Sequence, residues 1–233
     1  MGVMLQEPKP LIGGFYTIQE ASRILGLDSQ QRIRGWLSGY AGRAEPIICR
    51  QYPPVGDSQE VGFWDLLEIR FIEHFRKQGV SLQSIRKAAH AARVELHSQH
   101  PFAMSSIRFM TDRKRIFLHF AEKTGDKKLL DLMHGQFTMY EIIEQALARG
   151  IEFSPSTGLA QRWHPKPIEF PNVVLDPLIA FGQPVIDNAR IPTSALFSSW
   201  KAEGNDYSIV ADWYEIDEAL VRQAVEFETV LPA

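Results

Sequence analysis

The chain has 233 residues, of which 45% are hydrophobic and 23% charged, a composition typical of a globular protein. No apolar run approaches the roughly 20 residues that a membrane-spanning helix needs, and the first ten residues lack the basic start and apolar middle of a signal peptide. Cys49 is the only cysteine, which excludes an intrachain disulfide and a cysteine-based zinc site. These features predict a cytoplasmic protein.

The formal net charge of −3 conceals an uneven distribution of charge. Residues 1–150 contain 20 Lys and Arg against 16 Asp and Glu, a balance of +4. Residues 151–233 contain 5 against 12, a balance of −7. Such asymmetry is typical of a chain that contacts nucleic acid with one of its segments, here the first.

Residues 17–37 carry the pattern of a helix–turn–helix. Thr17 and Glu20 have the spacing of a capping box, and Gly26 can end the first helix. A second helix is expected over 29–37, and in this motif the second helix is offered to the major groove. It carries polar and basic residues that suit base edges and phosphates, although the same residues would also suit a solvated helix face. They are Ser29, Gln30, Gln31, Arg32 and Arg34.

A β-hairpin is predicted next, from strand-like runs at 47–52 and 60–63 that bracket a turn-rich segment. The order helix, helix, hairpin is that of a winged helix–turn–helix. We expect Arg43, Arg50 and Gln51 to place the wing on the phosphate backbone.

Two apolar helices follow, over 64–78 and from Ser81 to about residue 96. The apolar stripe of the second suits packing either within its own domain or against a second subunit. A hairpin is predicted over 107–120, and its basic tip, 113–115, is either a solvated turn or a contact for phosphate or an acidic partner. Helical segments are expected near 127–134 and 138–149.

The segment 154–167 is rich in proline and small polar residues and lacks an apolar period, so it predicts a linker. Short strand-like runs and three helices follow, the first beginning at Thr193 and the others spanning 206–213 and 217–227. The fold class we expect is mainly α with small β-hairpins (α+β). The expected division is a winged helix–turn–helix domain at 1–100, a middle hairpin and helices at 101–153, the linker, and a C-terminal β-hairpin and three-helix module at 168–233.

The last two helices repeat the helix–turn–helix outline with the opposite surface chemistry. The final helix offers Glu218 and Glu226 with a lone Arg222, and phosphate would repel it. The neighbouring carboxylates are best explained as helix caps rather than as a general acid and base, and the histidines at 90, 97 and 100 lack a metal-ligand spacing. We expect no catalytic residue, no metal and no cofactor.

Two segments resemble known families. Phe15-Tyr-Thr-Ile-Gln-Glu-Ala-Ser-Arg-Ile-Leu-Gly26, with the hairpin and helices that follow, resembles the DNA-binding domain of MerR-type regulators over residues 15–96. Val173-Val-Leu-Asp-Pro-Leu-Ile-Ala-Phe-Gly-Gln-Pro-Val-Ile186 and Ile209-Val-Ala-Asp-Trp-Tyr214 are similar to domain of unknown function 433, over residues 166–228. The combination resembles antitoxins of the VapB type, which are encoded beside PIN-domain ribonuclease toxins.

This resemblance implies an antitoxin that is not an enzyme, that neutralises a PIN-domain ribonuclease encoded nearby and that represses its own operon as a DNA-binding homodimer. Arg162 could then fill the carboxylate-lined site expected in such a toxin, although an exposed linker arginine would look the same. The aromatic candidates for toxin contact, which core burial would explain equally, are Trp163, Trp200 and Tyr214. The alternative function is a MerR-like transcription regulator whose C-terminal module senses a small molecule or another protein.

Overall fold

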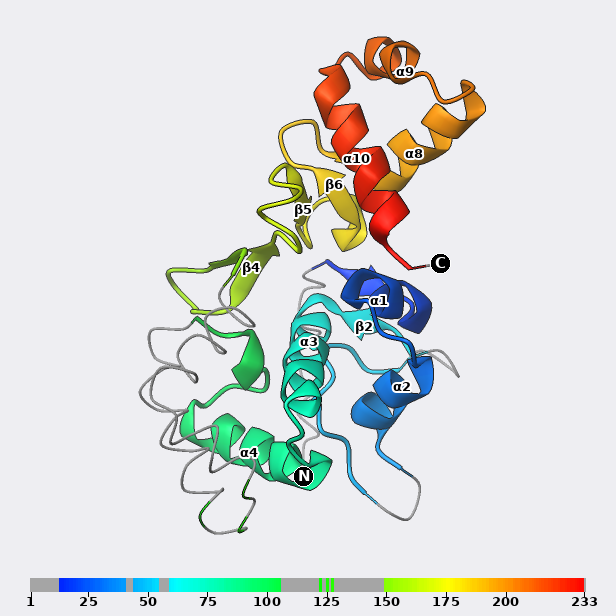
Figure 1. The fold of residues 1–233 in the computed structure, drawn as a ribbon. Helices are drawn as coiled ribbons and strands as arrows, with labels where there is room; N and C mark the ends of the chain where they lie inside the picture. The colour runs from blue at the N-terminus through cyan, green and yellow to red at the C-terminus, as the bar shows by residue number, and fades with distance from the viewer. Residues whose placement is uncertain are drawn as a thin grey trace, which may run out of the picture.

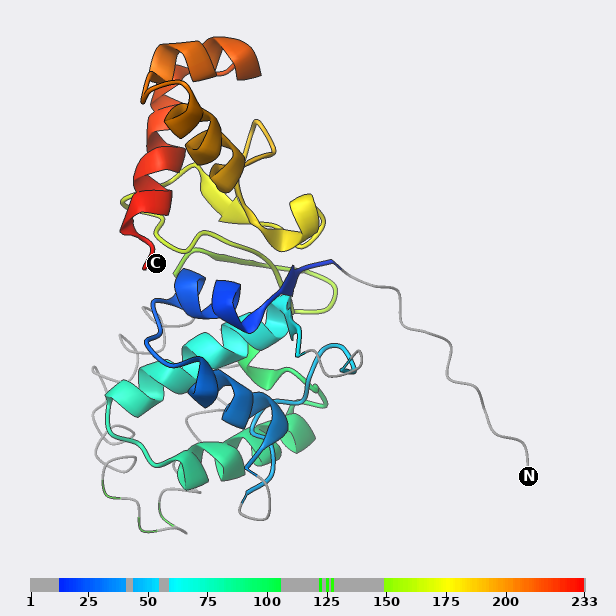
Figure 2. The same ribbon diagram turned by 90° about the vertical axis from the view of Figure 1, so that its right-hand side faces the viewer.

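The fold is known from a computed structural model that describes residues 13–40, 44–54, 59–105, 122, 125, 127 and 149–232. Helices α1–α4 form one end of the molecule, a five-stranded sheet lies in the middle, and helices α8–α10 form the other end (Figures 1 and 2). Across the described ranges there are seven α-helices and two small antiparallel sheets, so the fold is a mixture of helix and sheet. None of these helices combines the length and the apolar character needed to cross a membrane.

Helix α1 (Ile18–Leu25) has the predicted capping box. The Thr17 hydroxyl accepts a hydrogen bond from the Glu20 amide at 3.1 Å, and the Glu20 carboxylate accepts one from the Thr17 amide at 2.7 Å. The helix ends at Gly26, whose φ of 61° lies in the left-handed region that glycine tolerates. Helix α2 (Gln30–Ser38) then follows with the bounds expected to within one residue.

The predicted wing hairpin is wrong. Strand β1 (Phe15–Tyr16) pairs with β2 (Val61–Gly62), and the described residues between 47 and 52 contain no strand. The cause is a contact with α2, because the amides of Ile47 and Ile48 both donate to the Trp36 carbonyl, at 2.9 and 3.1 Å. Their side chains are buried there, so this segment wraps around α2 as a loop.

Helix α3 (Phe63–Lys77) and helix α4 (Leu82–Glu95) complete the first end of the molecule. The apolar stripe of α4 is fully buried at Ile85, Ala89 and Ala92, within the same core as α3. Packing within the chain therefore accounts for this stripe without a second subunit. The predicted hairpin over 107–120, with its basic tip, lies outside the described residues, as do nearly all of 127–134 and 138–149.

The middle sheet is an antiparallel meander in chain order. The segment predicted as a linker lies inside it, because residues 160–163 form a strand hydrogen-bonded on both sides. The isolated apolar residues of this segment are buried by contacts with distant helices, which its local pattern does not reveal. The strands are β3 (Ile151–Phe153), β4 (Ala160–Trp163), β5 (Val173–Leu175), β6 (Pro184–Ile186) and β7 (Ile191–Pro192).

Two hydrophobic cores meet at this sheet, a first core formed by α1–α4 and a second core formed by α8–α10. Ala160, Trp163 and Leu175 belong to the core formed by α1–α4, whereas Val173 and Ile186 belong to the core formed by α8–α10. The two cores therefore divide within β5, which lies C-terminal to the boundary predicted at 154–167.

Helices α8 (Thr193–Ala202), α9 (Tyr207–Tyr214) and α10 (Glu218–Val230) lie close to their expected bounds. Asp206 caps α9 by accepting from the amides of residues 208 and 209. The end of α10 returns to lie beside α1 (Figures 1 and 2), where Arg23 contacts Glu228. Nearby, the buried Tyr16 hydroxyl donates to the Gly182 carbonyl at 2.7 Å, in the 3-10 turn Ala180–Gly182 that precedes β6.

Candidate functional site

Helix α2 presents the predicted polar and basic residues on its exposed side. Ile33, Trp36 and Leu37 are buried against the first core, which fixes the rotation of the helix. Gln30, Gln31, Arg32 and Arg34 are consequently exposed, and Ser29, the residue before the helix, is partly exposed. The Ser29 hydroxyl makes no capping hydrogen bond in this structure.

A hollow of about 450 Å³ lies beside α2, at its junction with α1 and the approach to β2. Gln30 and Arg34 line it from α2, and Gln19 lines it from α1. Two amide side chains and a guanidinium can donate to base edges or phosphate oxygens. The acidic member of the lining is Glu60.

Sequence reasoning missed Gln19 and Gln59, which also line this hollow. Gln19 could have been predicted from the sequence. Ile18 and Ala21 lie on the apolar side of a predicted amphipathic helix, and Gln19 lies between them in sequence on the polar, outer side. Gln59 has no comparable local pattern. Its side-chain amide donates to the Ser38 hydroxyl at 2.9 Å, a contact that only the tertiary fold creates.

Arg32 differs from its neighbours, because its guanidinium is turned toward α3. It forms an ion pair with Glu73 and lies 5.5 Å from the centre of the Trp36 ring. The Arg32 side chain is 45% exposed, whereas the Glu73 side chain is 11% exposed. Arg32 therefore holds α2 on α3. Gln30, Gln31 and Arg34 are exposed, and no ion pair involves Arg34 within the part of the chain that the structure describes.

Arg50 and Gln51 lie on the loop that wraps around α2 and not on a strand of a wing hairpin. The Arg50 guanidinium donates to the Glu60 carbonyl at 2.9 Å. The Gln51 side chain accepts from the Trp64 amide and donates to the Tyr52 hydroxyl, each at 2.9 Å. Arg50 thus binds the loop to the residue before β2, and Gln51 binds it to the start of α3. Arg43 lies outside the described residues.

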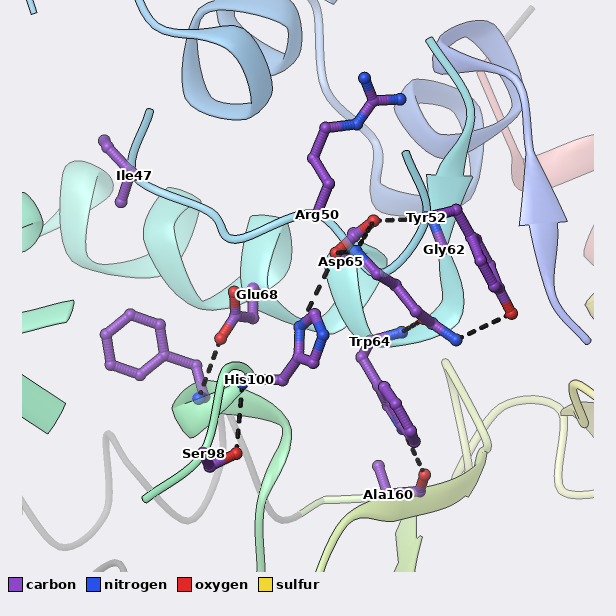
Figure 3. Close-up of polar contacts among 12 residues, drawn as sticks. Ile47, Arg50, Tyr52, Gly62, Trp64, Asp65, Glu68, Ser98, His100 and Ala160 are labelled. Carbon is purple, nitrogen blue, oxygen red and sulfur yellow. Dashed lines mark hydrogen bonds and ion pairs between the residues drawn. The ribbon is translucent and has the colours of Figure 1, made fainter. Parts of the chain in front are cut away.

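Asp65 is the buried centre of this anchor (Figure 3). Its carboxylate accepts from the Gln51 amide at 2.9 Å and from the Gly62 amide at 3.0 Å, and it lies 3.8 Å from Nδ1 of His100. Burial raises the pKa of Asp65 to about 6, although the two amides and Arg50 act in the opposite direction. The arrangement locks α3 to the loop before it, and it faces the interior of the protein.

Arg162 is not an exposed linker residue. It lies on β4, and three carboxylates surround its guanidinium. Glu152 is 3.4 Å away, Asp176 is 3.3 Å from Nε, and Asp187 pairs with Nη2. Burial opposes the charge, but the three carboxylates together raise the pKa of Arg162. These carboxylates already pair with the guanidinium that, by the family resemblance, could have filled the carboxylate-lined site of a toxin.

The three aromatic candidates for toxin contact lie mostly inside the protein. Trp163 is only 3% exposed, and Arg70 lies 5.2 Å from the centre of its ring. Trp200 is partly buried beside Tyr207, with 5.4 Å between ring centres. The Tyr214 hydroxyl is 3.1 Å from that of Ser199. Core burial therefore explains Trp163, and Trp200 and Tyr214 pack against the second core.

Comparison with known proteins relates both halves of the chain to others. Residues 173–227 match the family described as Protein of unknown function (DUF433). The chain is 29% identical over 227 residues to a protein of Mycobacterium tuberculosis described as "Putative antitoxin VapB45", and the match covers 91% of this chain and 92% of that protein. It also resembles the crystal structure of Rv2018 from Mycobacterium tuberculosis, with a TM-score of 0.69 and 26% identity, over 95% of this chain and 99% of that one.

Proposed function

We propose that this chain is an antitoxin that neutralises a PIN-domain ribonuclease toxin and binds operator DNA as an autorepressor. The observation that carries the proposal is the similarity to the Mycobacterium tuberculosis relative named as an antitoxin, because it extends over nearly the full length of both proteins. A match confined to residues 173–227 would concern only strands β5–β7 and the C-terminal helices. The proposed role needs no catalytic group, metal or cofactor of the chain's own.

The exposed side of α2 supports the DNA-binding part of the proposal. Gln31 and Arg34 are free to approach a duplex, and Gln30 and Gln19 lie beside Arg34. Glutamine suits adenine, and arginine suits guanine or phosphate. A homodimer would present two α2 helices to half-sites about one helical turn apart.

The acidic C-terminal half supports the toxin-binding part. Residues 151–233 carry a balance of −7, so a polyanion is a poor ligand for this half and a cationic protein surface is a better one. Toxin and operator would then be bound by opposite ends of the molecule, which lie apart in Figure 1. Insertion of Arg162 into the toxin's carboxylate-lined site is not proposed, because its guanidinium is already paired.

Co-expression with the protein encoded by the adjacent open reading frame tests the proposal. The full chain is expected to rescue growth of cells that express this protein and to co-purify with it. The full chain is also expected to shift DNA from its own promoter and not a scrambled duplex of equal length. Absence of both rescue and co-purification would contradict the antitoxin function.

A cavity favours one alternative function, a transcription regulator that senses a small molecule. The cavity measures about 340 Å³ and lies between the start of α3 and the sheet, with Phe63, Trp64 and Leu159 among its apolar lining. Its volume falls at the lower end of the range of ligand sites. Promoter binding that changes with a small metabolite, without rescue from any neighbouring protein, would favour this function.

A further inference from the structure

Helix α9 carries exposed apolar side chains in the part of the chain richest in carboxylates. Ile209 and Trp213 are one helical turn apart and are 38% and 63% exposed. Trp is one of the residue types that contribute most to the binding energy of protein interfaces, so this exposed pair is a candidate protein-binding surface. The opposite side of α9 packs against the rest of the protein, because Val210 and Ala211 are buried in the second core.

The chain around this pair is strongly acidic. Residues 203–220 contain no Lys, Arg or His, and they contain six carboxylates, which gives a charge of −6. Some of these carboxylates have internal roles, since Asp206 and Asp217 cap helices and Glu218 pairs with Arg222 at 2.6 Å. Within the part of the chain that the structure describes, Asp212 and Glu215 form no ion pair, and Asp212 directly precedes Trp213.

We propose that the α9 surface, formed by Ile209, Asp212, Trp213 and Glu215, binds the toxin through an apolar socket rimmed by Lys and Arg. The proposal rests on the proposed function and adds the surface and the chemistry of the partner. Trp213 fills the socket and contributes most of the affinity, as a central aromatic residue does in protein interfaces. Asp212 and Glu215 face the cationic rim, where charge complementarity mainly speeds association.

The negative charge of this surface argues against the two other candidate partners, operator DNA and a second copy of the chain. Operator DNA would be repelled by the carboxylates of residues 203–220. In a symmetric contact between two copies, the same patch faces itself, so Asp212 and Glu215 of one copy would lie against the same carboxylates of the other. The position of α9 agrees with a separate partner, because it lies at the far end of the molecule from α2 in both views (Figures 1 and 2). Both ends can therefore be occupied together.

The test uses the full chain and the purified product of the adjacent open reading frame. Trp213→Ala is expected to raise the Kd at least about 30-fold, the effect of a hot-spot residue. Leu178→Ala is the matched control, because Leu178 is 77% exposed in the same half but lies outside α9, and it is expected to change the Kd less than about threefold. Thermal unfolding of each variant verifies that the fold is retained.

Charge is tested with Asp212→Lys and its control Glu226→Lys, an exposed position of α10 outside residues 203–220. Asp212→Lys is expected to slow association several-fold at about 50 mM salt, and the difference should vanish at about 500 mM because screening removes it. Glu226→Lys should have the smaller effect at low salt.

The outcomes separate this inference from the proposed function. Wild-type binding and growth rescue with an unchanged Kd for Trp213→Ala would overturn the α9 surface and leave the antitoxin function standing. Weaker operator binding, or loss of a dimer, caused by Trp213→Ala would assign the surface to DNA or to a second copy and overturn the inference. Failure of the wild-type chain to bind or rescue would overturn the proposed function and the inference with it.

Discussion

Arg23 of α1 and Glu228 of α10 join the first helix of the described chain to the last. The Arg23 guanidinium lies 2.8 Å from the Glu228 carboxylate and also donates to the Glu228 carbonyl at 3.1 Å. The other carboxylate oxygen of Glu228 accepts from the Thr193 hydroxyl at the start of α8. Glu228 is nearly fully buried, with 4% of its side chain exposed, so these partners replace the water that its carboxylate has lost.

Arg23→Ala should lower the free energy of unfolding by about 2 kcal/mol, because it leaves the buried Glu228 carboxylate without its cation. Urea unfolding measures this change. Lys77→Ala is the control, since Lys77 is 3.9 Å from Glu73 and 64% exposed, and its loss should cost less than about 0.5 kcal/mol. Equal effects of the two substitutions would contradict the role assigned to Arg23.

Asp65 predicts a stability that falls as pH rises. Burial raises its pKa from 3.8 to about 6, so its contribution is fully present below about pH 4 and is lost as pH rises through about 6. The shift corresponds to about 3 kcal/mol. Asp65→Asn removes the titration, so the free energy of unfolding of the variant minus that of the wild type should increase by this order between pH 4 and 7. A difference that does not change with pH would refute the prediction.

Asp206 provides a comparison of opposite sign. Hydrogen bonds from the amides of Ile209 and Ser208 lower the pKa of this exposed carboxyl group. Its contribution is therefore present above the unfolded-state value and is lost as pH falls through the folded-state value. The loss of unfolding free energy caused by Asp206→Asn should therefore become smaller as the pH falls. For Asp65→Asn the opposite is expected, because the wild type gains stability relative to this variant as the pH falls.

Arg34→Ala should weaken operator binding and flatten its salt dependence by about one unit if the guanidinium contacts a phosphate. Gln31→Ala should cost about 1–3 kcal/mol on the operator and little on unrelated DNA if the amide contacts a base edge. Gel shifts at several salt concentrations measure both. Arg190→Ala is the matched control, an exposed arginine in the C-terminal half, and an effect as large as that of Arg34→Ala would contradict the assignment to α2.

Arg162→Gln should lower the free energy of unfolding by about 2 kcal/mol, because it leaves Asp176, Asp187 and Glu152 to repel one another. Binding to the adjacent gene product should remain unchanged under conditions where the variant is folded. Unchanged stability with weakened binding would instead restore Arg162 as a contact residue.

The helices at both ends of the molecule could be predicted because their signals are local. Thr17, Glu20 and Gly26 determine where α1 begins and ends within a few residues of sequence. Strand β4 could not be predicted this way, since its position depends on Trp163 and on the bond from the Trp64 indole to the Ala160 carbonyl, 96 residues apart. A strand created by distant contacts looks like a loop in its own sequence.

The candidate DNA surface could be predicted only in part. The residue types on α2 identify an exposed polar face, and burial of Trp36 and Leu37 confirms which residues are exposed. The ion pair between Arg32 and Glu73 spans 41 positions, and the hydrogen bonds of Gln51 reach α3. Such pairings depend on the tertiary fold, so sequence alone did not distinguish structural residues from available ones.

The position of β5 between the two cores affects how this protein unfolds and is degraded. Leu175 completes one core and Val173 the other, so local opening at β5 exposes apolar surface in both halves at once. We expect a single cooperative unfolding transition and no long-lived fragment that retains one activity. A cell that degrades this chain would thus remove both ends in one event.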